Sequence, residues 1–120
     1  RNPINLVLDT KTMLQSLERV SVVISEKLKS PVRCLFEDNK VTMSAKTASG
    51  DAKDVCRIAG DGQGLEIGFN NRYLMDALRY APADTVKMEL NTGISPAIIV
   101  PVEGEENFLY MVLPVRLKAN

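Results

Sequence analysis

The sequence predicts an α+β fold in which a β-α-β-β-β unit occurs twice, with its strands in two antiparallel sheets and two helices packed on one side. Two observations lead to this fold class. An internal repeat recurs at an offset of about half the chain. Within each copy the hydrophobic pattern changes from a strand-like period to a helical one. With 120 residues, 45% of them hydrophobic, residues 1–120 match one ordinary globular domain.

The repeat is clearest where residues 6–17 are echoed by residues 66–78. Each segment opens with a short apolar strand, passes a polar residue suited to cap a helix, Asp9 or Asn70, and enters a stretch of helical period. We therefore expect the unit to occupy residues 4–59 and again residues 65–117.

The other strands are predicted from apolar runs bounded by turn-forming residues. In the first unit they are residues 32–37, 40–46 and 54–59; in the second they are residues 85–90, 97–102 and 108–115. The expected turns are residues 37–39, 48–51, 91–93 and 103–107. The glycine-rich segment 60–64 is interpreted as a flexible turn that joins the units. A phosphate loop is disfavoured because the segment leads into a strand and lacks a following Lys-Ser/Thr.

The first predicted helix has one apolar stripe. At 100° per residue its core-facing members are Met13, Leu14, Leu17, Val20, Ser21 and Ile24. Val22 and Val23 fall outside the stripe, where a solitary domain would prefer polar side chains. Two interpretations remain open: the valines face a partner subunit, or the helix ends by Ser21 and both valines tuck into the following turn.

The second predicted helix buries Leu74, Met75, Ala77 and Leu78 and leaves Arg72, Asp76 and Arg79 on its opposite face. Local ion pairs three or four residues apart explain this charged cluster without a function. However, the repeat makes the two helices neighbours. The cations on their outer faces could then meet a phosphate backbone, and these are Lys11, Arg19, Arg72 and Arg79.

The composition excludes several classes of function. Because 15 basic side chains balance 15 acidic ones, no net field would hold the domain on nucleic acid. The chain has no His, so Cys34 and Cys56 lack the usual base for thiol catalysis, and we interpret them as buried, reduced thiols of a cytoplasmic protein. The acidic residues Glu103, Glu105 and Glu106 are interpreted as a solvated loop. We expect no enzyme activity, no cofactor and no metal. The apolar runs are too short for a membrane helix.

Residues 108–117 form an apolar run that is interrupted by Pro114. Proline cannot donate a hydrogen bond to a neighbouring strand, so Pro114 belongs at an edge or a strand terminus. Either the segment is a last core strand with a frayed tail, or it provides a hydrophobic docking patch that includes the adaptable side chain of Met111.

Residues 110–117, Tyr-Met-Val-Leu-Pro-Val-Arg-Leu, closely resemble the Met-Pro-Met-Arg-Leu type of ending found in bacterial sliding clamps. Residues 67–70, Ile-Gly-Phe-Asn, followed by Tyr73 resemble another stretch of the same domain. With the duplicated unit, the likeness to the C-terminal domain of the DNA polymerase III beta subunit family covers essentially the whole chain. Since the chain begins at Arg1 rather than Met, we expect a segment of a longer soluble protein.

This resemblance implies a DNA clamp fold, a non-catalytic processivity factor, and a homodimeric ring of three-domain subunits around duplex DNA. The ring would tether the replicative polymerase and also bind the clamp loader and other proteins through short linear motifs. The implied peptide-binding cleft comprises Asn70, Tyr73, Ile94, Pro96, Met111, Leu113, Pro114, Val115 and Arg116. Val22 and Val23 would lie at the subunit interface.

Two departures from the family pattern are visible. Lys118-Ala119-Asn120 extends beyond the usual Arg-Leu ending and could crowd the cleft, and the middle domain's share of the cleft is absent from these residues. The alternative to a clamp is a free-standing protein-interaction adaptor or DNA-binding domain.

Overall fold

The computed structural model describes residues 3–24, 30–48, 50–102 and 108–117. The predicted acidic loop at residues 103–107 and the tail at residues 118–120 lie outside the described residues. The elements, in chain order, are β1 (Ile4–Asp9), α1 (Thr10–Ser21), β2 (Val32–Thr47), β3 (Gly50–Phe69), α2 (Asn71–Tyr80), β4 (Thr85–Leu90), β5 (Ala97–Pro101), β6 (Tyr110–Val112) and β7 (Pro114–Val115).

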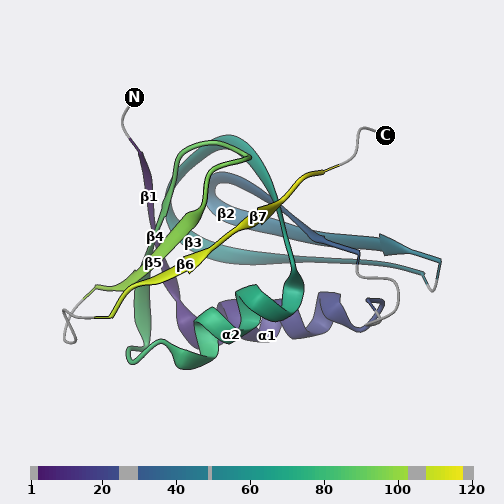
Figure 1. Cartoon of the computed structure of the whole chain (residues 1–120), viewed down its shortest axis with the longest axis horizontal. Coiled ribbons are helices and arrows are strands. Elements are labelled where there is room, and N and C mark those ends of the chain that lie inside the picture. Colours follow the sequence, from purple (N-terminus) through teal and green to yellow (C-terminus); the bar gives the residue numbers. More distant parts are fainter. Residues whose placement is uncertain (1–2, 25–29, 49, 103–107, 118–120) are drawn as a thin grey trace.

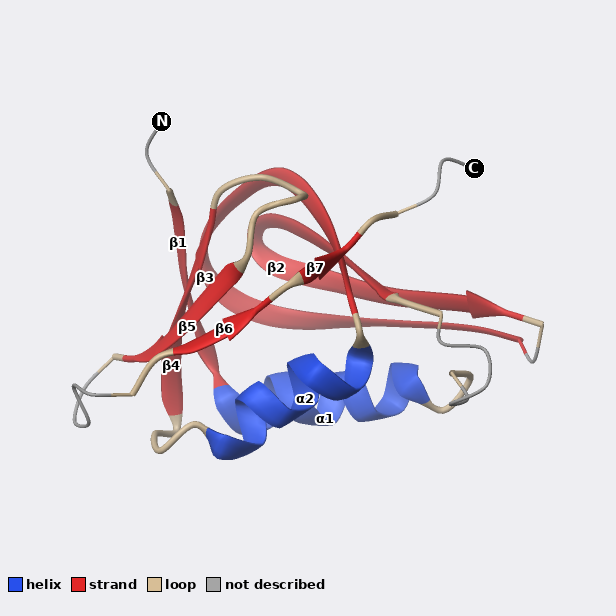
Figure 2. Ribbon diagram, viewed as in Figure 1, coloured by secondary structure: helices blue, strands red, loops and turns tan. Residues whose placement is uncertain are grey.

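Both helices lie against the same side of the strands, as Figures 1 and 2 show. Each begins at the polar residue expected from the sequence. The Asp9 carboxylate accepts hydrogen bonds from the backbone N–H of Thr12, at 2.9 Å, and from the Thr12 hydroxyl, at 2.7 Å. The Asn70 side-chain oxygen accepts from the N–H groups of Arg72 and Tyr73, at 3.0 and 3.2 Å. The predicted caps and the predicted α+β class are confirmed.

The strands pair in the order β2-β3-β1-β4-β5-β6, with β7 joined to β3, and every pairing is antiparallel. The two expected sheets share β3: this strand pairs with β2 along most of its length, with β1 at Ala59, and with β7 at its end. The result is one curled sheet rather than two separate ones (Figure 2).

Two predicted turns, at residues 37–39 and 60–64, are wrong because the strands continue through both. Irregularities absorb the turn-forming residues: the register shifts on either side of Asp38, and Asn39, Gly60, Gln63 and Gly64 adopt positive φ angles. The predicted strand 108–115 is instead divided at Leu113, where the chain leaves β5 and crosses to β3.

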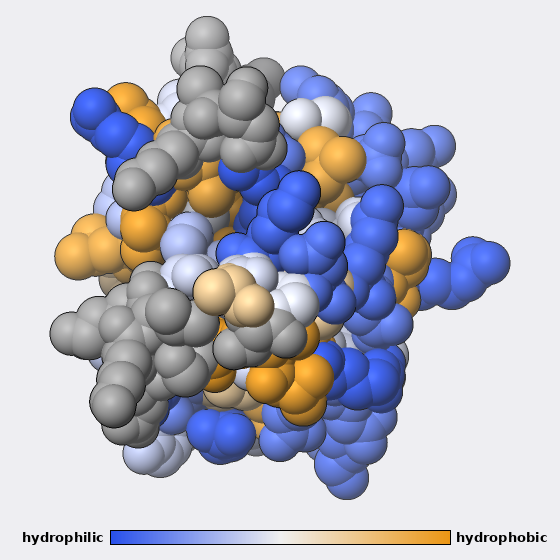
Figure 3. All heavy atoms as spheres, turned by 90° about the vertical axis from the view of Figure 1, so that its right-hand side faces the viewer, coloured by the Kyte–Doolittle hydropathy of each residue, from blue (hydrophilic) through white to orange (hydrophobic). Residues whose placement is uncertain are grey.

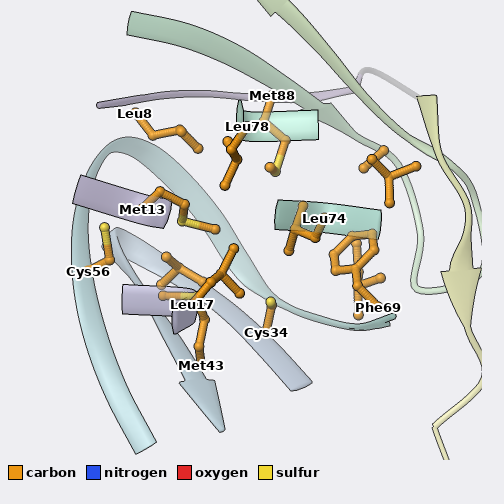
Figure 4. Packing of buried hydrophobic residues seen from close by; sticks show 14 of the residues in the cluster. Leu8, Met13, Leu17, Cys34, Met43, Cys56, Phe69, Leu74, Leu78 and Met88 are labelled. Carbon is orange, nitrogen blue, oxygen red and sulfur yellow. The ribbon is translucent and has the colours of Figure 1, made fainter. Parts of the chain in front are cut away.

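The core fills the space between helices and sheet (Figure 4). From the helices, Met13, Leu17 and Leu74 are fully buried; from the sheet, Phe36 and Phe69 are. The predicted stripe of α1 is confirmed at Met13, Leu17 and Val20. Leu14 and Ile24 are partly buried and pack against the core. Along the described segments, no helix is long and apolar enough to cross a membrane.

Candidate functional site

Large hydrophobic side chains stay exposed around the C-terminal strands. Tyr73 is 60% exposed, Ile94 74%, Met111 54%, Leu113 65% and Val115 36%. We call these five residues the docking surface. All of them belong to the cleft predicted from the sequence. Figure 3 shows that hydrophobic side chains also reach the surface on one side of the molecule, in areas separated by hydrophilic ones.

Strand pairing places two members of the docking surface on one side of the sheet. In β6, Val112 pairs with Ala97 and both are buried, whereas Met111 pairs with the half-buried Ile98. Leu113 follows Val112 and is again exposed, as expected when successive side chains of an extended segment alternate.

The short strand β7 brings the chain end to α2. Pro114 pairs with Phe69 and Val115 with Gly68, at the end of β3. Asn70 follows immediately, and Tyr73 lies in the first turn of α2, a helix that also contacts β6. Residues from positions 70–73 and 111–115, far apart in sequence, are therefore neighbours.

The connection between β4 and β5, residues 91–96, carries Ile94. It is held internally by a hydrogen bond of 2.7 Å between the hydroxyls of Thr92 and Ser95 and by the Ile94 N–H donating to the Thr92 hydroxyl at 3.2 Å. It also lies against β3, since a Cβ added at Gly93 would be 2.8 Å from the carbonyl oxygen of Glu66. The loop is thus packed on the same end of β3 as β7.

The polar members of the predicted cleft differ in what they can offer. Asn70 uses its side-chain oxygen as the cap of α2, so its amide N–H groups are the part suited to a further contact. Arg116 is exposed just beyond β7. A hydrophobic surface with donors at its rim can bind an extended peptide.

Sequence reasoning left Leu117 out of the site. Its side chain is half-buried and lies over Gly68 of β3, where a Cβ would be 2.5 Å from Cδ2 of Leu117. The Arg-Leu ending was part of the resemblance and was the signal that could have identified this residue.

The two valines predicted at a subunit interface have different environments. Helix α1 ends at Ser21, as one interpretation required. Val22 is 79% exposed, while Val23 packs against the margin of the core and its carbonyl accepts a hydrogen bond of 2.8 Å from the Thr47 hydroxyl. Val23 therefore tucks in, as the second interpretation predicted, whereas Val22 is exposed and its packing against a partner subunit stays a prediction.

The four helix cations are exposed, and two of them, Arg19 and Arg79, form ion pairs. Arg19 contacts Asp54 of β3 at 2.8 Å, and Arg79 contacts Asp76 at 3.4 Å and Glu18 at 3.7 Å. The Glu18–Arg79 pair links the two helices. The Ser16 hydroxyl and then the Arg19 guanidinium hold the pKa of Asp54 below its usual value, against the opposing effect of partial burial.

Neither thiol is poised for chemistry. Burial raises the pKa of Cys34 to about 12 and also raises the pKa of Cys56, so both remain protonated at neutral pH. Within the part of the chain that the structure describes, no group of three or more acidic or Cys side chains could hold a metal ion.

Comparison with known proteins gives consistent matches. The family model described as DNA polymerase III beta subunit, C-terminal domain, matches residues 2–116. A beta sliding clamp of Synechocystis sp. is 32% identical over an alignment of 120 positions, which covers 93% of this chain and 29% of that protein. The chain spans less than a third of the length of the curated relatives it matches.

Solved structures show the same arrangement of elements. The DNA polymerase III beta subunit from Thermotoga maritima has a TM-score of 0.86 and 29% identity, covering 95% of this chain and 31% of that one. The sliding clamp from Bartonella birtlesii, solved bound to griselimycin, has a TM-score of 0.88 and 27% identity, covering 97% and 31%. The expected clamp fold is confirmed.

Proposed function

The chain belongs to the DNA polymerase III beta subunit family, whose C-terminal domain it matches, and on this premise we propose that it is the partner-docking domain of a ring-shaped sliding clamp. Residues 1–120 would be the third domain of each subunit, with the internal repeat at residues 4–59 and 65–117. The ring would act as a processivity factor that encircles duplex DNA and tethers the replicative polymerase.

The observation that carries this proposal is the docking surface. Its five large apolar side chains stay exposed: Met111, Leu113 and Val115 belong to the segment that forms β6 and β7, while Tyr73 lies on α2 and Ile94 in the connection before β5. Burying one such side chain against a partner contributes about 1.5–3 kcal/mol, so a few well-seated contacts suffice for a short peptide. The replicative polymerase, the clamp loader and other clamp-binding proteins would each present a linear motif with hydrophobic side chains.

Duplex DNA would be contacted without sequence preference. The supporting features are the exposed positions of Lys11, Arg19, Arg72 and Arg79 on α1 and α2 and the zero net charge of the chain. Because Arg19 and Arg79 are engaged with carboxylates, their attraction to phosphates is reduced. A ring held by its closed shape needs only weak contacts of this kind in order to slide.

The homodimer interface would include Val22 and Val23. Val22 would contact the second subunit, while Val23 is partly buried against the domain's own core. An exposed Val at the end of a helix is suited to packing against a second subunit. We further propose that the domain is non-catalytic and needs no cofactor; the protonated, buried thiols and the absence of His from the sequence support this.

The test is a peptide titration with the full-length protein and with this chain labelled for NMR. A short peptide containing glutamine and hydrophobic residues should shift the amide signals of Tyr73, Ile94, residues 111–113 and residues 115–117. Leu113→Ser in the full-length protein should raise the peptide's Kd about tenfold or more. A loss of about 1.4 kcal/mol of binding free energy corresponds to a factor of ten in Kd.

Val55→Ser is the matched control. Val55 is exposed to a similar degree, 54% against 65% for Leu113, but it lies on β3, outside the docking surface. It should leave the Kd unchanged. If the full-length protein shows no binding at all, peptide docking is wrong and only the clamp fold remains.

A further inference from the structure

Gly68 lies at the most crowded point beneath the chain end. A Cβ built there would be 2.5 Å from Leu117 Cδ2, 2.9 Å from Leu117 Cγ and 2.7 Å from the carbonyl oxygen of Val115. Contacts this short do not occur with a real side chain. The strand surface at this position is therefore open only because the residue has no side chain.

Backbone conformation does not explain this glycine. Gly50, Gly60 and Gly64 have positive φ angles, whereas Gly68 has an ordinary extended conformation that other residues adopt. A glycine inside a strand weakens the strand and often marks a close approach of another backbone. At Gly68, that approaching segment is the C-terminal one, residues 115–117.

The C-terminal strand has few other anchors. β7 consists of two residues, and its described pairing with β3 is limited to Phe69 with Pro114 and Gly68 with Val115. Two residue pairs alone hold a strand weakly. The side chain of Leu117, half-buried over Gly68, adds an apolar contact just after the strand ends.

We propose that Gly68 is a positioning residue of the docking surface: its missing side chain seats Leu117 on β3 and so holds β7 in place. This inference rests on the proposed function, because Leu113 and Val115 are useful for docking only while β7 keeps its register. Gly68 itself lies beneath the segment and is buried, so it acts through Leu117 and Val115 rather than by touching a peptide.

The experiment compares Gly68→Ala with Gly64→Ala in the full-length protein. Gly64 lies in the same strand and has a φ of +77°, but a Cβ there meets nothing within 4 Å. Gly64→Ala should therefore lower the thermal midpoint through backbone strain and leave peptide binding unchanged. Gly68→Ala should raise the peptide's Kd at least about tenfold. It should also speed amide hydrogen exchange at Leu113 and residues 115–117, with slow exchange retained in α1 and β1.

Leu117→Ala approaches the same contact from the other side and serves if Gly68→Ala does not fold. It should also speed exchange at Leu113 and Val115. The double variant should lose less peptide-binding free energy than the sum of the single losses, because both changes act on one contact. Wild-type exchange and affinity in Gly68→Ala would overturn the proposal. If the wild-type protein binds no peptide, docking itself fails, and the exchange rates of β7 still decide whether Gly68 positions the strand.

Discussion

At the scale of single residues, the two helix caps perform the same task with different chemistry. Asp9 caps α1 with a carboxylate and Asn70 caps α2 with an amide oxygen. The hydrogen bonds from Thr12, first from its hydroxyl and then from its backbone N–H, lower the pKa of Asp9 below its usual value of 3.8. The charged form is therefore favoured in the folded state, whereas the amide of Asn70 does not titrate.

Asp9→Ala is expected to lower the free energy of unfolding by about 1 kcal/mol at neutral pH. A lowered pKa in the folded state stabilises the fold above the unfolded pKa, and this contribution is lost as pH falls through the folded pKa. The difference between wild type and Asp9→Ala should thus narrow on acidification in urea unfolding experiments. Asn70→Ala should cost a similar amount at every pH; equal narrowing in both variants would contradict the role of the Asp9 charge.

At the scale of elements, ion pairs tie the helices to their surroundings. Arg19 of α1 contacts Asp54 of β3, and Glu18 of α1 contacts Arg79 of α2. Exposed pairs of this kind contribute little stability, about 0–1 kcal/mol. Their larger effect is on the electrostatic field of the helix surface, because each pairing offsets a positive charge.

Lys11→Ala and Arg19→Ala should consequently differ in their effect on DNA binding by the full-length protein. The slope of log K against log salt concentration is negative, and removing one phosphate contact makes it less negative by about 0.9. Lys11→Ala should approach that value, and Arg19→Ala should change the slope less, because its guanidinium is already held by Asp54. Asp54→Ala, which releases Arg19, should strengthen binding at low salt. Identical slopes for Lys11→Ala, Arg19→Ala and the wild type would argue against DNA contact by α1.

At the scale of the whole molecule, the two exposed apolar surfaces that we propose for different partners lie apart from each other. The docking surface lies where β6, β7 and the start of α2 meet, while Val22 lies at the opposite end of α1 from the Asp9 cap. An exposed apolar residue at this place has no role in the domain's own core, so it can be changed without unfolding the domain.

Val22→Asp should therefore leave the thermal midpoint of this chain unchanged and dissociate the full-length dimer, which sedimentation velocity would detect. A charge buried without a partner at an interface is strongly unfavourable. Val55→Asp again provides the control, as an exposed valine distant in sequence and on a strand. A full-length Val22→Asp protein that sediments as the wild-type dimer would remove Val22 from the interface.

The sequence by itself determined the features that depend on neighbouring residues. The caps at Asp9 and Asn70, the buried stripe of α1 at Met13, Leu17 and Val20, and the class of fold all follow from local propensity and period. The exposed residues of the docking surface were also predicted, but through the resemblance of residues 110–117 to a family rather than from the periodic pattern.

Only the tertiary structure decided the features that depend on residues far apart in the chain. β2 and β3 continue through turn-forming residues because the two strands pair with each other on both sides of the irregular positions. Arg19 contacts Asp54 because α1 packs on β3. The requirement for glycine at position 68 arises from Leu117, 49 positions later (117 − 68). Local sequence carries no signal for such contacts, since they exist only once distant backbones have been brought together.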